Sequence, residues 1–366
     1  MPAGPLGPGE PDLVWETGEG VDEMRTSARS RRIHRGLRLA AATMAGVLGG
    51  MWAILALDTA RSQALDPPDP PTTAVIDHAV TWSTYPERAA MTNPVDPGLV
   101  ERCRTSDFVV ITFSGTGMAD SQYQANMIQS HVEDLGGCVM YHWYGHTYDE
   151  VASARSVERA VEDVTAPGER KPVVLLGASF GGIAAEDIAA QPAVADSPVI
   201  DLRKIIMVAT PVDMNDVIQD VFGVPVPLIK DIPLGIPRFG GLVVLGNAVN
   251  GQGQRGELLD PVEWRETFTN AAKTRPLLMW SQLERIRKGM LTVRSDIPVD
   301  YLGSPDSDMT VDTDHAYARL DNLVMAPTRY FTVPGGGHDE GWLLSMADRY
   351  NEKLVPILAE LFGQAA

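Results

Sequence analysis

Ser179 is the residue whose setting best suits covalent chemistry. It lies in a Gly-x-Ser-x-Gly sequence over residues 177–181. The apolar run 173–176 before it predicts a strand buried on both faces, and residues 183–186 favour a helix. A sharp turn between a strand and a helix raises the serine hydroxyl clear of the sheet, where it can act as a nucleophile. The alternative interpretation of the motif is a structural turn without chemistry.

Gly177 and Gly181 flank the serine for a steric reason. The turn holds the serine in a strained backbone conformation, and the helix and the strand cross close to it. Side chains at the two flanking positions would collide at this crossing, so glycine is expected there. These residues therefore form the turn that is called a nucleophile elbow.

His338 is the clearest partner for the serine. It follows the predicted strand 330–333, after a proline and three glycines at 334–337. Catalytic groups in open α/β sheets gather at the carboxyl ends of the strands, and the glycines allow the loop to bend back towards Ser179. An imidazole titrates near neutrality, so it can take the serine proton and return it to a leaving group. The alternative is a histidine on a surface loop. Two further histidines, His142 and His146, follow another strand towards the same edge and are candidates to line a pocket.

Strands and helices alternate around these residues. Strands are predicted at 107–113, 138–144, 173–176, 200–209, 299–302 and 330–333, and helices at 121–135, at 150–164, after the serine and at 341–362. This alternation predicts an α/β fold with a doubly wound, mostly parallel sheet. The connection over residues 211–296 is far longer than such a fold requires. Its apolar stretches and a helical region around 264–290 indicate an inserted cap over the site rather than a disordered loop.

The composition limits the partners. The chain has 366 residues, 44% of them hydrophobic, and a formal net charge of −18. The length and the apolar content suffice for one large α/β domain with appendages. A nucleic-acid partner is not expected, because phosphate binding needs a basic face. Two isolated cysteines cannot form a closed zinc site without other ligands, so no metal site is predicted.

The N-terminal part has a different organisation. Residues 1–38 read as a disordered tail that ends in six arginines between positions 25 and 38, and the run 39–57 carries no charge. As a helix this run would span about 28 Å, close to the thickness of a bilayer core. We expect a retained transmembrane anchor with a cytoplasmic N-terminus and an extracytoplasmic domain. The alternatives are a signal peptide cleaved after residues 62–64, which would release a secreted protein, and a buried core helix. Residues 58–75 are expected to be a proline-rich spacer and residues 76–366 the globular domain.

The order of these features resembles the α/β-hydrolase superfamily over residues 107–366. An early strand is followed by the turn Ser114–Gly117, the serine elbow comes next, an acid follows the penultimate strand, and a histidine follows the last one. The insert 211–296 also falls where that superfamily places its lid. The resemblance implies the fold of that superfamily and a catalytic triad of serine, histidine and acid.

The resemblance implies an aspartate just past the strand 299–303. Asp308 fits this position best, Asp306 is the second candidate, and Asp213 is the third because some relatives take their acid from the preceding strand. The carboxylate would hold His338 in the correct tautomer and stabilise its cation.

The oxyanion hole is expected to consist of main-chain N–H groups. Phe180, directly after the nucleophile, would supply one, and Thr116 in the early turn would supply the other. The commoner histidine-glycine start of that turn is replaced here by Ser114–Gly115. The departure weakens the assignment of the donor residue but leaves a main-chain donor in place.

The implied function is that of a membrane-anchored, extracytoplasmic serine esterase or lipase that cleaves carboxylic esters through an acyl-enzyme without a cofactor. The alternatives are a thioesterase or acyltransferase with the same triad, and a binding module of this fold without catalysis. The resemblance also makes the strands near Cys103 and Cys138 parallel neighbours. In an exported domain this arrangement favours a disulfide between the two cysteines.

Overall fold

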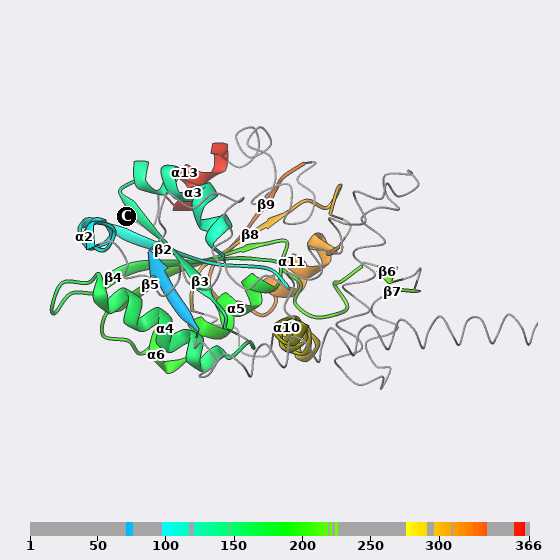
Figure 1. Ribbon diagram of the computed structural model, residues 1–366. Helices are drawn as coiled ribbons and strands as arrows, with labels where there is room; N and C mark the ends of the chain where they lie inside the picture. The colour runs from blue at the N-terminus through cyan, green and yellow to red at the C-terminus, as the bar shows by residue number, and fades with distance from the viewer. Residues whose placement is uncertain are drawn as a thin grey trace, which may run out of the picture. The chain divides into compact units, whose positions relative to one another are not determined.

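The structure is a computed structural model (Figure 1). It describes residues 71–75, 97–116, 121–145, 147–218, 220–221, 224–225, 276–290, 296–308, 310–334 and 355–362. The predicted tail and anchor, and most of the predicted cap, lie outside these residues. Among the helices that are described, none is both long enough and apolar enough to cross a bilayer.

A seven-stranded sheet forms the centre of the described residues, in the order β1-β3-β2-β4-β5-β8-β9. The strands are β1 (Thr72–Val75), β2 (Phe108–Phe113), β3 (Gly137–Trp143), β4 (Lys171–Ala178), β5 (Ile200–Val208), β8 (Val299–Gly303) and β9 (Thr328–Thr332). All neighbouring pairs are parallel except β1 and β3. The mostly parallel sheet predicted from the sequence is therefore confirmed. A separate antiparallel pair, β6 (Asp220–Val221) and β7 (Val224–Pro225), lies within the insert.

Strand β1 begins the sheet earlier than predicted. Thr72 pairs with Trp143 and Val75 with Met140, so β1 forms an antiparallel edge of the sheet. The interpretation of residues 58–75 as a spacer is therefore wrong for these last residues. The β-branched Thr and Val residues favour a strand, but the segment has only 4 residues and directly follows prolines, so the strand became evident only from its pairing with β3.

The helices that connect the strands are mostly those predicted. They are α2 (Pro97–Thr105), α3 (Gln122–Asp134), α4 (Glu150–Asp163), α5 (Phe180–Ala189), α6 (Pro192–Ala195), α10 (Pro276–Lys288), α11 (Thr313–Asp321) and α13 (Val355–Phe362). Helices α2, α6 and α11 were not predicted. Helix α10 confirms part of the helical region expected in the insert, and α13 confirms the described part of the closing helix.

Each face of the sheet has its own hydrophobic core. Successive residues of β2 alternate between the two: Val109 and Ile111 lie in one core, and Phe108 and Val110 in the other. Helices α4, α5, α10 and α11 contribute to the first core, and α3 and α13 contribute to the second. Figure 1 shows α3 and α13 next to each other on one side of the sheet. The sheet is thus covered on both faces, which explains the continuous apolar runs of its strands.

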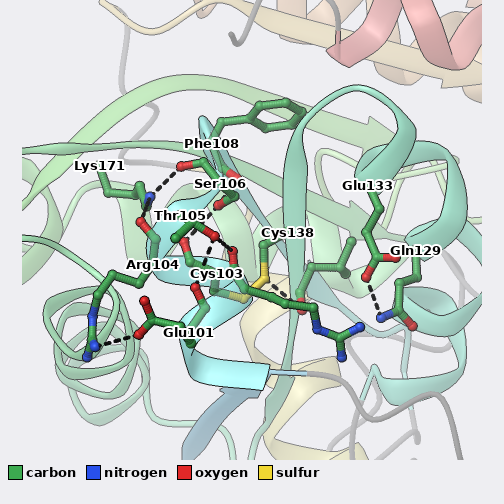
Figure 2. Close-up of a disulfide and its surroundings, with 12 residues drawn as sticks. Glu101, Cys103, Arg104, Thr105, Ser106, Phe108, Gln129, Glu133, Cys138 and Lys171 are labelled. Carbon is green, nitrogen blue, oxygen red and sulfur yellow. Dashed lines mark hydrogen bonds and ion pairs between the residues drawn. A yellow bond between two sulfur atoms is a disulfide. The ribbon is translucent and has the colours of Figure 1, made fainter. Parts of the chain in front are cut away.

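A disulfide joins α2 to β3. Cys103 and Cys138 are bonded with their Cα atoms 5.1 Å apart, and Figure 2 shows the bond beneath the residues that lead into β2. The pairing is the one expected from the sequence. Nearby, the Lys171 Nζ donates to the carbonyl oxygens of Arg104 (3.1 Å) and Ser106 (2.5 Å), so the start of β4 is tied to the same segment.

Candidate active site

Ser179 occupies a strained turn between β4 and α5. Its backbone has φ 53° and ψ −123°, a region that side-chain-bearing residues rarely adopt. Such a conformation costs about 1–3 kcal/mol and persists only where the surroundings impose it. Here the Ser179 N–H donates to the carbonyl oxygen of Val208 at 2.7 Å, which fixes the turn against the end of β5.

Close backbone contacts explain the glycines around the serine. A Cβ atom on Gly177 would lie 2.1 Å from the carbonyl of Gly181. A Cβ on Gly181 would lie 2.1 Å from the carbonyl oxygen of Phe113, and one on Gly182 would lie 2.1 Å from the Thr210 Oγ1. No side chain fits at these positions. The role of Gly182 was missed in the sequence, because its neighbour Thr210 is remote along the chain.

The turn after β2 lies against the start of α5. Gly181 approaches the carbonyl oxygens of both Phe113 and Ser114, so the end of β2 and the first turn of α5 touch. Thr116, the predicted second oxyanion donor, follows in this turn and is half-buried. The structure thus brings Phe180 and the Ser114–Thr116 turn to the same edge of the sheet. Gly117 lies outside the described residues.

Asp308 lies in the turn after β8 and is buried. Its Oδ1 accepts from the backbone N–H groups of Thr310 (2.8 Å) and Val311 (2.9 Å). Its own N–H donates to the carbonyl oxygen of Ser304 at 2.7 Å. The side chain retains 6% exposure, whereas Asp306 is exposed. Asp308 is therefore the more firmly oriented of these two carboxylates.

Asp213 is engaged in a different network. Its Oδ2 pairs with the Arg319 Nη2 at 2.6 Å, and its Oδ1 accepts from the Asn215 N–H at 2.6 Å. The buried Asp216 accepts from Arg319 (3.0 Å), from the His315 Nδ1 (2.7 Å) and from two backbone N–H groups. These carboxylates hold the loop after β5 to α11. No local pattern in the sequence indicated Asp216.

The loop after β5 is joined to the turn that carries Asp308. The Ile218 N–H donates to the carbonyl oxygen of Thr310 at 2.9 Å, and the Asp312 N–H donates to that of Asp216 at 2.8 Å. Val217 and Val311 also form an isolated antiparallel bridge. The position of Asp308 therefore depends on two loops that lie far apart in the sequence.

His338 and His146 lie outside the described residues. The strand before His338 is described: β9 pairs with β8, and the Val333 N–H continues the ladder to the carbonyl oxygen of Gly303 at 2.8 Å. The chain thus leaves the sheet next to the strand that precedes Asp308. The role of His338 stays a prediction.

His142 belongs to the core rather than to a pocket. Its Nδ1 lies 3.0 Å from the Thr73 Oγ1 and its Nε2 3.1 Å from the Ser153 Oγ, and the side chain is fully buried. Burial lowers the pKa of His142 to about 3, so the ring is neutral at neutral pH. The interpretation of His142 as a pocket residue was wrong. Its hydrogen bonds join β1, β3 and α4.

The comparison with protein families decides the class of the protein. The family model described as "Alpha/beta hydrolase family" matches residues 78–353, most of the chain. The chain belongs to the alpha/beta hydrolase family. The match includes Ser179, Asp308 and His338 within its span. None of the curated proteins that were compared matches the chain.

The chain is also similar to several solved structures at low sequence identity. A putative aryl esterase from Burkholderia cenocepacia is 14% identical, with a TM-score of 0.44 over 71% of this chain and 91% of that one. The type II thioesterase BorB from the borrelidin biosynthetic cluster is 17% identical, with a TM-score of 0.42 over 69% and 91%. Alpha/beta hydrolase domain-containing protein 10 from mouse is 14% identical, with a TM-score of 0.41 over 70% and 90%. The class assignment rests on the family model.

Proposed function

We propose that this alpha/beta hydrolase is a serine hydrolase that cleaves carboxylic esters. The observation that carries the proposal is the strained Ser179 backbone at φ 53°, held between β4 and α5 by glycines that no side chain can replace. A protein gains no stability from a strained serine at this position, so the strain is best explained by the need to present the hydroxyl.

In the proposed mechanism Ser179 attacks the ester carbonyl carbon and gives its proton to His338. The carbonyl oxygen becomes an oxyanion that accepts hydrogen bonds from the N–H groups of Phe180 and Thr116. His338 then donates the proton to the departing alcohol, and an acyl-enzyme remains. His338 then takes a proton from a water molecule, whose oxygen attacks the acyl carbonyl carbon, and returns that proton to the Ser179 Oγ as the carboxylic acid leaves. Apart from the substrate and this water, the proposed steps use side chains and main-chain groups of this chain.

We assign Asp308 as the acid that orients His338. Its support is its burial, its two backbone hydrogen bonds and its place after β8, next to the strand that leads to His338. Asp306 is exposed, and Asp213 is already paired with Arg319. Asp308 thus combines a fixed orientation with the position that the family pattern requires.

A fluorophosphonate probe tests the proposal directly. Such a probe forms a covalent bond with an activated serine, so the wild type should be labelled and Ser179→Ala should not. A control at a serine away from the elbow, Ser197→Ala before β5, should be labelled like the wild type. Absence of labelling in folded wild type would reject the enzyme proposal and favour a binding module. Hydrolysis of a panel of acyl esters and thioesters would identify the preferred acyl chain and whether the leaving group is an alcohol or a thiol.

We further propose that residues 39–57 anchor the protein in a membrane with the catalytic domain on the extracytoplasmic side. The support is the uncharged run and the arginines before it. Full-length protein in a membrane fraction should resist high salt and be released by detergent. Recovery in the soluble fraction, with a mature N-terminus near residue 65, would show instead that the segment is a cleaved signal peptide.

A further inference from the structure

A buried charge cluster fastens the helix of the insert to the helix of the nucleophile. Helix α10 belongs to the long insert, and it lies beside α5, which begins at Phe180 directly after the serine. Asp187 comes from the last turns of α5, and Arg285 comes from α10. The Arg285 Nε donates to the Asp187 Oδ2 at 2.7 Å, and its Nη2 donates to the Oδ1. The pair is bidentate, the geometry in which an arginine fixes orientation as well as distance.

The third member of the cluster is Tyr148, from the segment between β3 and α4. Its hydroxyl donates to the Asp187 Oδ2 at 2.8 Å, and its backbone N–H donates to the Ser281 Oγ of α10 at 2.8 Å. The Asp187 carboxylate therefore accepts three hydrogen bonds from two elements outside α5.

The position of Asp187 is unfavourable without these partners. The side chain is 5% exposed and lies near the C-terminus of a helix, where the helix dipole disfavours a negative charge. Burial raises the pKa of Asp187 above its usual value, while the hydrogen bonds from Arg285 and Tyr148 lower it. A buried ion pair contributes little net stability compared with apolar packing, so the cluster is better explained by orientation than by stability.

The cluster connects to the proposed oxyanion hole through aromatic rings. The Tyr148 ring packs edge-on against Phe180 with centroids 4.9 Å apart, and the Tyr144 ring packs against both at 5.9 Å. The Tyr144 hydroxyl donates to the carbonyl oxygen of Ser114 at 3.0 Å, in the turn that leads to Thr116. The same group of side chains thus touches both segments that would supply oxyanion donors.

We propose that Arg285, Asp187 and Tyr148 are positioning residues that use the insert helix α10 to set the orientation of α5 and, through Phe180, the geometry of the oxyanion hole. This inference rests on the proposed function, in which the Phe180 N–H binds the oxyanion. The insert then has a role in catalysis through α10, besides any role in covering a substrate. In this proposal the three residues do not touch the reacting atoms, and they act through α5 and the packing of the Phe180 ring on the position of the Phe180 N–H.

A second bidentate pair provides a matched control. Asp300 in β8 is 1% exposed and accepts from the Arg329 Nε and Nη2, both at 2.7 Å, while the Lys204 Nζ lies 2.8 Å away. This cluster lies near the amino ends of β8 and β9, away from the serine turn. It matches the Arg285 pair in chemistry and in the burial of its carboxylate, but not in location.

The test compares Arg285→Lys, Tyr148→Phe and the control Arg329→Lys in the full chain. Arg285→Lys keeps the positive charge but loses the planar guanidinium that binds both Asp187 oxygens. Tyr148→Phe keeps the ring that packs against Phe180 but loses the hydroxyl. Ester hydrolysis is measured with p-nitrophenyl acetate, and active sites are counted by fluorophosphonate titration. Phenylboronic acid, which forms a tetrahedral adduct with an active serine, reports on the oxyanion hole.

Arg285→Lys should lower kcat per titrated site about tenfold or more and leave KM within about twofold of the wild-type value. The affinity for phenylboronic acid should fall by the same factor as kcat. Tyr148→Phe should show the same pattern with a smaller loss. Arg329→Lys should lower the melting temperature and leave kcat per site unchanged. An unchanged kcat in both Arg285→Lys and Tyr148→Phe would overturn the inference, as would an equal loss in Arg329→Lys. Failure of the wild type to react with the probe would instead reject the proposed function itself.

Discussion

The stability of the fold should fall in mild acid because of His142. The pKa of its buried ring is lowered from 6.5 to about 3 by burial, and its hydrogen-bond partners within the described part of the chain are the uncharged hydroxyls of Thr73 and Ser153. The unfolded chain binds a proton at this residue below pH 6.5, whereas the folded protein does not bind it until about pH 3. The unfolded state therefore holds more protons across this window, and the free energy of unfolding decreases as the pH falls.

The magnitude follows from the shift. One pKa unit corresponds to about 1.4 kcal/mol, so His142 should remove about 2 kcal/mol between pH 6.5 and 5, and on the order of 5 kcal/mol if the protein survives to pH 3. His142→Gln cannot take up this proton but retains a polar side chain. The free energy of unfolding in urea, followed by tryptophan fluorescence between pH 7 and 5, should therefore fall about 2 kcal/mol less in His142→Gln than in wild type.

Measurements between pH 6.5 and 5 separate the effect of His142 from that of the carboxylates, because carboxylates titrate mostly below pH 5. His131→Gln, on the partly exposed face of α3, is the control for replacing a histidine by glutamine as such. An identical decline in wild type and His142→Gln would refute the reasoning, because it would mean that the buried ring takes up its proton as readily as a histidine in water.

Three further outcomes are expected. Gly181→Ala should lose several kcal/mol of stability or fail to fold, because its Cβ would lie 2.1 Å from the Phe113 carbonyl oxygen. Gly168→Ala is the control: no atom lies within 4 Å of its Cβ position, so it should cost only about 1 kcal/mol because of its positive φ. Urea unfolding measures the stability of both variants. In an ester hydrolysis assay, Asp308→Asn should lower kcat by up to about 10⁴-fold, whereas Asp306→Asn and Asp213→Asn should change kcat far less. A severe loss of kcat in Asp306→Asn alone would identify Asp306 as the triad acid instead. Replacing both Cys103 and Cys138 by serine should cost about 3–4 kcal/mol, because the bridge closes a sequence separation of 35 residues; an unchanged melting temperature would count against a stabilising bridge.

The elements that the sequence predicted well have a local signal. The apolar run 173–176 lies within β4, and the periodic segments before and after β3 form α3 and α4 within a residue or two of the expected bounds. Helices α2 and α11 carry no such signal, because charged and polar residues interrupt them. Contacts with remote parts of the chain order these helices: the disulfide holds α2, and Arg319 fastens α11 to Asp213 and Asp216. Such contacts cannot be inferred from neighbouring residues.

The residues of the candidate site likewise fall into those with a local sequence signal and those without one. Ser179 and its flanking glycines form one short motif, so their geometry could be predicted, and the backbone of the turn agrees with it. The acid could only be narrowed to three candidates, because its distance from the serine depends on loops of variable length. The link between Asp187 and Arg285 spans 98 positions, and no pattern within either helix indicates the other. The sequence therefore indicated the nucleophile better than the groups that orient it.

Polar groups, besides the apolar packing of Val212, Met214 and Val311, hold the loops at the candidate-site edge of the sheet. Asp308 and Asp216 each accept two backbone N–H groups, and the Tyr144 hydroxyl donates to the backbone oxygen of Ser114. Loop residues lack the regular hydrogen bonds that neighbouring strands provide, so side chains must form hydrogen bonds with the backbone N–H and C=O groups that these loops bury. Each such bond is directional, and the change of a single oxygen or nitrogen can misalign a loop while the two hydrophobic cores stay packed. Substitutions in these side chains should therefore reduce activity more than they reduce stability, because catalysis depends on alignment to within about an ångström.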